Sequence, residues 1–312
     1  MIQIRRILCP TDFSEFAQRA LHQAVPLARW YDAPLTALHV VPAAVPVDGM
    51  FPYALPPLAN EGARTRLEQD LRTFVAPARQ AGLVCDTVLR EGPVPTRILE
   101  LARELPADLL VMGTHGQGGL ERLVLGSVTE SVLRKAPCPV LTIPHEERAT
   151  SGPAPFKRIL YATDFSPAAE HALGFALSLA EEAQGVLILA HVMEGPTLAA
   201  TTSGLPVNVS RLTADLARDA ERALRDAVPA GAREWCTTEE VVAFGHPADE
   251  IMRLAREREA QLIVVGVHGR NALDLMLFGS TTHHVVRKAP CAVLAIPALR
   301  AAERPVAAAG RR

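Results

Sequence analysis

The sequence lacks the features of several large classes of protein. Its 312 residues include no run of eighteen apolar residues free of charge and proline, so we expect no membrane-spanning helix. The start of the chain has no long apolar segment with a small-residue cleavage site, so we expect a cytoplasmic protein without a signal peptide. Aromatic residues make up only 4% and the formal net charge is −2, which leaves few platforms for stacking bases and no broad basic surface. We therefore expect neither nucleic acid nor a membrane as a partner.

Cysteines are also few. The five cysteines form no Cys-x-x-Cys pair and are odd in number, which argues against a disulfide framework and against a thiolate metal site. We predict buried, reduced thiols and no metal bound by the side chains of the protein.

What the chain does contain is one unit that occurs twice. Residues 108–144 align without a gap onto residues 261–297, with 19 of 37 positions identical. The start of the unit recurs as well, since Thr11-Asp12-Phe13-Ser14 returns as Thr163-Asp164-Phe165-Ser166. A length of 312 residues suits two domains better than one. We therefore predict a first domain over 1–146, a second over 155–298 and a disordered tail over 299–312.

Short apolar runs alternate with segments of helical periodicity in each unit, which is typical of βαβ units. We expect five strands per unit, near 4–9, 34–41, 84–90, 108–112 and 139–143, and near 157–162, 186–193, 236–243, 261–265 and 292–296. Ser166 followed by Pro167 marks a helix start, and Ser14 takes the same place in the first unit. The predicted fold class is α/β, with two tandem open, doubly wound, five-stranded and mainly parallel sheets that have helices on both faces.

A glycine-rich motif follows the fourth strand of each unit. It reads Gly-x-x-Gly-x(9)-Gly-Ser and comprises Gly113, Gly116, Gly126 and Ser127, then Gly266, Gly269, Gly279 and Ser280. Open parallel sheets bind ligands outside the carboxyl ends of their strands, and the free N–H groups of a helix start suit a phosphate. The structural alternative is that the glycines only permit tight turns and that Ser127 forms a capping box with Glu130. The identical spacing in both units weakens that alternative.

Other fingerprints of nucleotide binding and catalysis are absent. No Gly-x-x-x-x-Gly-Lys-Ser/Thr occurs, which excludes a P-loop. Gly116-Gln117-Gly118 starts a dinucleotide pattern, but Glu121 stands where its third glycine belongs. No second acid or base at a recognisable spacing accompanies His115 or His268, so we predict no catalytic residue.

The glycine motif, together with an Asp after the first strand, resembles the universal stress protein family, and the two units resemble its tandem type. The likeness runs from about Ile4 to Pro144 and from about Phe156 to Pro297. It implies an adenine-nucleotide alpha hydrolase-like fold that binds ATP, with Mg²⁺ held through the phosphates. Some members of the family lack the glycine set and do not bind ATP. Both units here keep it, which implies one competent site per domain.

The resemblance also implies which residues line each nucleotide site. Those of the first two strands belong to the adenine side: Pro10, Thr11, Asp12 and Val40, then Ala162, Thr163, Asp164 and Val192. Those at the ribose are Met112, Gly113, Val265 and Gly266. Those at the phosphates are Gly116, Gly126, Ser127, Val128 and Thr129, then Gly269, Gly279, Ser280, Thr281 and Thr282. An alternative for the two Asp residues is that they only brace the turn.

The leading hypothesis is a cytoplasmic stress-response protein that binds ATP once per domain and whose occupancy sets its conformation or its partners. A slow Mg-dependent ATPase and a nucleotide-independent scaffold are the alternatives. The last strand of each unit is an apolar run that would be exposed as a bare edge. The resemblance implies that these two strands pair within the chain as a pseudo-dimer, and a homodimer of the whole chain is left open.

Overall fold

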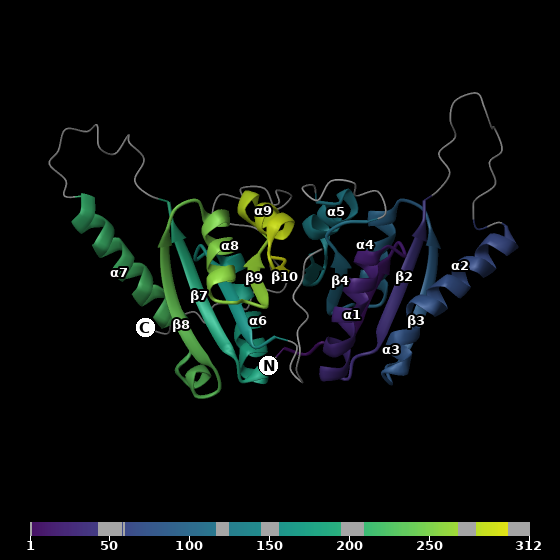
Figure 1. Cartoon of the computed structure of the whole chain (residues 1–312), viewed down its shortest axis with the longest axis horizontal. Helices are drawn as coiled ribbons and strands as arrows, with labels where there is room; N and C mark the ends of the chain where they lie inside the picture. The colour runs from purple at the N-terminus through teal and green to yellow at the C-terminus, as the bar shows by residue number, and fades with distance from the viewer. Residues whose placement is uncertain are drawn as a thin grey trace, which may run out of the picture.

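The computed structural model describes residues 2–42, 58, 60–116, 125–144, 156–194, 209–267 and 279–298. Within these ranges the chain forms two α/β units with the same succession of strands and helices (Figure 1). The predicted boundaries at 146 and 155 and the predicted tail over 299–312 fall on residues outside these ranges, so they remain predictions.

The first unit contains five strands and five helices among its described residues. In chain order they are β1 (Ile7–Thr11), α1 (Glu15–Trp30), β2 (Leu35–Val41), α2 (Glu61–Phe74), α3 (Ala76–Gln80), β3 (Cys85–Glu91), α4 (Val94–Glu104), β4 (Leu109–Gly113), α5 (Ser127–Lys135) and β5 (Val140–Ile143). The expected strand near 4–9 begins later than predicted. The N–H groups of Arg5 and Arg6 bond to Asp108 Oδ2, at 2.8 and 3.0 Å, instead of to a neighbouring strand.

The second unit repeats this order with one short 3₁₀-helix, η3, in place of α3. Its elements are β6 (Arg158–Thr163), α6 (Pro167–Ala183), β7 (Val186–Met193), α7 (Val209–Ala227), η3 (Ala230–Glu234), β8 (Thr237–Phe244), α8 (Pro247–Glu257), β9 (Leu262–Gly266), α9 (Ser280–Lys288) and β10 (Ala292–Ile296). The predicted helix starts are confirmed, because Ser14 accepts a bond from the N–H of Ala17 and Ser166 one from the N–H of Ala169.

The ten strands form one continuous sheet in the order β3-β2-β1-β4-β5-β10-β9-β6-β7-β8. Strands pair in parallel within each unit, as the alternation of strands and helices predicted. The two units meet through β5 and β10, which run antiparallel with Leu141 opposite Leu294. The apolar last strands therefore cover each other's edges, as the resemblance implied.

Helices cover both faces of the sheet. The core on one face packs α1 and α6 against the sheet, with Leu27 and Leu179 among its buried residues. The core on the other face holds α5 and α9, with Val132 and Val285. Each core contains residues of both units, so the hydrophobic interior runs across the junction. In Figure 1, α5 and α9 lie near that junction while α2 and α7 form the outer flanks.

In the described parts of the chain, none of the helices combines the length and the apolar character that crossing a bilayer requires. The five cysteines are free thiols, and burial raises the pKa of Cys9 and Cys138 to about 12. These two thiols are therefore protonated at neutral pH and poor nucleophiles.

Candidate functional site

The expected site residues of the first domain gather at the carboxyl edge of the sheet, where β1 lies between β2 and β4. Thr11 pairs with His39, so Asp12 and Val40 stand at neighbouring strand ends. The chain leaves β1 toward β2 and leaves β4 toward β5, which makes this the switch point where open α/β sheets bind ligands. The second domain has the same arrangement, with β6 between β7 and β9.

The turn after β1 is braced by its own side chains. Thr11 Oγ1 accepts a hydrogen bond from the N–H of Phe13 at 3.0 Å, and Asp12 Oδ1 accepts one from the N–H of Ser14 at 3.0 Å. The second domain repeats both bonds, at 2.9 and 3.0 Å. The bracing role considered for Asp12 is therefore present, and it uses one of the two carboxylate oxygens.

The other oxygen of Asp12 faces the glycine motif. A methyl group built on Gly116 would lie 2.5 Å from Asp12 Oδ2. Only a residue without Cβ leaves that carboxylate in place, so the close approach accounts for the middle glycine of the motif. Its counterpart Gly269 lies outside the described residues.

A phenylalanine in an unfavourable backbone conformation follows the Asp of each domain. Phe13 has φ 64° and Phe165 has φ 59°, a left-handed region that costs a bulky residue free energy. The ring of Phe13 packs on His39 at 4.5 Å, and His39 Nδ1 lies 2.8 Å from the carbonyl oxygen of Thr11. The second domain has the same pair with His191, at 4.6 Å and 2.8 Å. This contact holds the ends of two strands together at the site. The sequence motifs did not predict it, although both residues recur in the two units.

The first glycine of each motif permits close packing of a helix. A methyl group on Gly113 would lie 2.9 Å from Phe16 Cβ and 3.1 Å from its backbone carbonyl, at the start of α1. On Gly266 it would lie 2.9 Å from the carbonyl carbon of Ala168, at the start of α6. These glycines therefore hold the helix start against the strand end, in addition to any contact with a ligand.

The motif ends at a helix start that no side chain caps. Gly126 is the N-cap of α5 and Gly279 that of α9, with no side-chain cap hydrogen bond from the described residues. The capping box of Ser127 and Glu130 is wrong, because Ser127 is the first helical residue and Glu130 pairs with Arg134 at 2.6 Å. Ser127 is exposed. The first N–H groups of α5 and α9, which have no partner within a helix, are thus left for an anion.

Two of the residues expected at the phosphates have hydroxyls that point into the fold. Thr129 is 4% exposed and its Oγ1 donates to the carbonyl oxygen of Gly113 at 3.0 Å. Thr282 Oγ1 donates to Gly266 in the same way, at 2.9 Å. These hydroxyls tie each phosphate-side helix to the end of β4 or β9, which leaves only their backbone N–H groups to face a ligand.

Most of the remaining expected residues are buried. Buried strand positions are occupied by Pro10, Val40, Met112, Ala162 and Val265. Half-buried positions are occupied by Val128, Val192 and Thr281, and Ser280 is exposed like Ser127. The site is therefore built largely from backbone and small side chains at the sheet edge.

Little in the described residues suggests acid–base or metal chemistry. No group of three or more His, Cys, Asp or Glu side chains in these ranges is placed to hold a metal ion. His115 follows the first glycine, where its Nδ1 lies 2.9 Å from Thr114 Oγ1 and its ring 5.4 Å from that of Phe16. His268 lies outside the described ranges.

Comparison with known proteins identifies relatives of both domains. The model of the "Universal stress protein family" matches residues 3–144 and again residues 155–297. A universal stress protein of Mycobacterium tuberculosis is 31% identical over 270 residues, which cover 84% of this chain and 86% of that protein. One of Methanocaldococcus jannaschii is 35% identical over 143 residues, covering 45% of this chain and 81% of that protein.

Among solved structures, a universal stress protein of Archaeoglobus fulgidus superposes on nearly the whole chain. Its TM-score is 0.68 at 22% identity, and the match covers 95% of this chain and 99% of the other. This likeness supports the fold, with two tandem α/β domains.

Proposed function

Since this chain belongs to the universal stress protein family, we propose that each of its two domains binds an adenine nucleotide, with ATP as the ligand. Occupancy of the two sites sets the conformation of the protein or its partners under stress. The observation that carries the proposal is the uncapped helix start after Gly126 and after Gly279, placed at the switch point of the sheet.

The phosphate end of the proposed site has the chemistry that an anion needs. The first N–H groups of α5 point out of the helix, and the helix dipole adds partial positive charge there. Exposed Ser127 supplies a hydroxyl donor at the same place. Any Mg²⁺ arrives with the nucleotide and is held by phosphate oxygens, as is usual for this ion.

The side of the proposed site formed by the ends of β1 and β2 suits the nucleoside. Asp12 is held by the N–H of Ser14 through one oxygen, and its other oxygen lies against Gly116. The carboxylate is thus fixed at the sheet edge, where it can accept hydrogen bonds from a ligand at little entropic cost. Buried Val40 gives this end an apolar wall.

Binding is favoured over hydrolysis because the part of the turn that the structure describes offers no positioned base. Among the described residues of the turn, His115 is the titratable side chain, and it contacts Thr114 and Phe16. Fast hydrolysis needs a group that orients and deprotonates water.

A charge placed on the first residue of α5 or α9 tests the proposal. Ser127→Glu and Ser280→Glu put a carboxylate where the phosphates would bind, at a helix position where Glu is favourable for folding. Calorimetric titration with Mg-ATP should give two sites for the wild type, one for each single variant and none for the double variant. The unfolding temperature without ligand should stay the same or rise in all of them.

Gln69→Glu, which adds the same charge on the exposed face of α2, is the matched control and should keep two sites. Neither heat nor a thermal shift with wild-type protein would rule the proposal out and favour the scaffold. Two sites that survive both Ser substitutions would place the phosphates elsewhere. Release of phosphate during a single-turnover incubation would favour the slow ATPase.

A further inference from the structure

The two domains differ in the size of one side chain at the proposed sites. α1 begins Glu15-Phe16 after its cap Ser14, whereas α6 begins Pro167-Ala168 after Ser166. Phe16 and Ala168 are thus the second residues of equivalent helices. Both lie against the first glycine of their motif, at 2.9 Å from the methyl position of Gly113 or Gly266.

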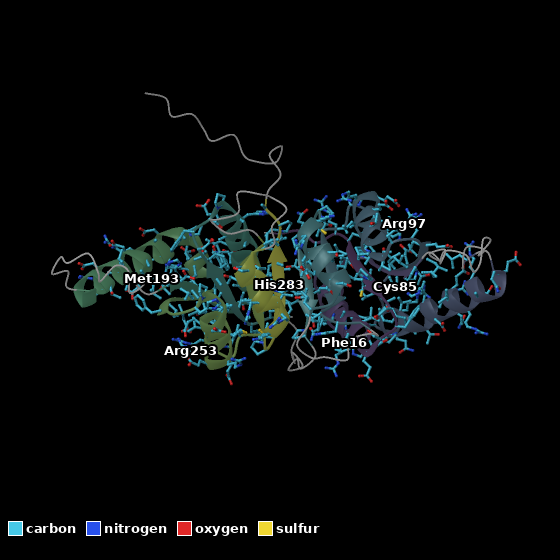
Figure 2. The ribbon with its side chains drawn as sticks, turned by 90° about the horizontal axis from the view of Figure 1, so that it is seen from above. Phe16, Cys85, Arg97, Met193, Arg253 and His283 are labelled. Carbon is cyan, nitrogen blue, oxygen red and sulfur yellow. The ribbon has the colours of Figure 1, made fainter. Side chains whose placement is uncertain are left out.

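The ring of Phe16 lies toward the phosphate end of the first site. Side chains on a helix lean toward its N-terminus, which for α1 is the carboxyl edge of the sheet. The ring is half-buried, and its centroid lies 5.4 Å from that of His115. Figure 2 marks Phe16 in the first domain, at the purple part of the ribbon. His115 Cα in turn lies 3.7 Å from the methyl position of Gly126, the cap of α5. The ring is therefore placed between the start of α1 and His115, which lies beside the cap of the phosphate-side helix.

The second domain has a small side chain at the position that corresponds to Phe16. Ala168 offers only a methyl group at the corresponding position and is 6% exposed. The second domain has an aromatic residue in its first strand, Tyr161, where the first domain has Cys9. Tyr161 is 2% exposed and donates from its hydroxyl to the carbonyl oxygen of Ala169 at 2.8 Å, in the core beneath α6. Its ring is thus held in the core beneath the first turn of α6.

We propose that the difference between Phe16 and Ala168 makes the two sites prefer phosphate chains of different length. Phe16 narrows the phosphate end of the first site, which binds ATP but binds AMP or ADP more tightly, while the second site binds ATP in preference to both. The inference rests on the proposed function and deepens it, because the protein would then respond to the ratio of long to short adenylates.

Single-site proteins allow the two preferences to be compared. Ser280→Glu leaves the first site and Ser127→Glu leaves the second, and each is titrated with ATP, ADP and AMP by calorimetry. The ratio of the ATP to the AMP association constant should be lower in the first site. Phe16→Ala should raise that ratio by about tenfold, and Ala168→Phe should lower it in the second site to a similar degree, as expected for a misfit of this size.

Trp235→Ala is the control. It removes an aromatic ring just before the amino end of β8, at the edge of the sheet opposite to the proposed sites. The ratio of the ATP to the AMP association constant should stay unchanged in both single-site proteins. Phe16→Leu and Ala168→Leu repeat the test with smaller changes in volume if either first choice fails to fold. Equal ratios in the two single-site proteins, or a higher ratio in the first, would overturn the inference and leave nucleotide binding intact. Absence of binding by any adenylate would overturn the proposed function and the inference together.

Discussion

Trp30 donates a hydrogen bond from its indole Nε1 to Oε2 of Glu182 at 3.3 Å, which joins the end of α1 to the end of α6 across the two domains. Glu182 Oε1 accepts a bond from Ser178 Oγ at 2.9 Å, and Ser178 Oγ accepts one from the N–H of Ile2 at 2.6 Å. Burial and then Glu182 raise the pKa of Tyr31. One carboxylate thus connects two helices and the N-terminal segment of the chain.

Glu182→Ala should therefore loosen the junction of the domains. We expect the free energy of unfolding to fall by about 1 kcal/mol, the usual value for hydrogen bonds with partial exposure. The fluorescence of Trp30 should shift to longer wavelength, measured in a Trp235→Phe background so that one tryptophan remains. Glu181→Ala is the control, since Glu181 lies near Cys236 of its own domain. The same shift in both variants would mean that the contact does not hold the junction.

Two glycines of one motif should separate binding from packing. In Gly116→Ala the new methyl group meets the end of the Asp12 side chain, which can move, so the stability should change little. Nucleotide affinity of the first site should fall about tenfold, because a fixed acceptor is displaced. In Gly113→Ala the methyl group meets Phe16 Cβ and backbone, so unfolding should become easier by about 1–3 kcal/mol. Urea unfolding and calorimetry in the Ser280→Glu background would measure both, and the reverse pattern would contradict these roles.

The sequence predicted the elements well because periodicity reports which side chains are buried. The strands fall within a few residues of their predicted places, and the largest error, at the first strand, came from the unforeseen bonds of Arg5 and Arg6 to Asp108. The pairing of β5 with β10 is present as the resemblance implied.

Side-chain direction was harder to predict than position. Similarity placed Thr129 at the phosphates, but its hydroxyl donates to Gly113. The spacing of Ser127 and Glu130 suggested a capping box, but the helix begins one residue earlier than that box requires, with Gly126 as the N-cap. The bond between Trp30 and Glu182 joins helices far apart in the chain, and no local pattern reports such a contact.

A histidine found only in the second domain should make stability depend on pH. His284, on α9, lies with Nε2 3.8 Å from Asp249 Oδ1, and its ring centroid is 6.2 Å from that of His246. Burial lowers the pKa of His284, Lys288 and Arg287 lower it further, and Asp249 opposes them. The first domain has Ser131 at the equivalent position.

The folded protein therefore binds a proton at His284 less readily than the unfolded chain, whose ordinary histidine pKa is about 6.5. Between the lowered pKa of the folded state and about 6.5 the unfolded state holds more protons, so the free energy of unfolding falls as the pH is lowered through this window. His284→Ser should reduce the difference between unfolding temperatures at pH ~8 and pH ~5. His22→Gln, at an exposed position of α1, is the control for loss of a histidine. If both variants keep the full wild-type difference, other groups govern the acid response; if His284→Ser enlarges it, protonation of His284 stabilises the fold and the sign is reversed.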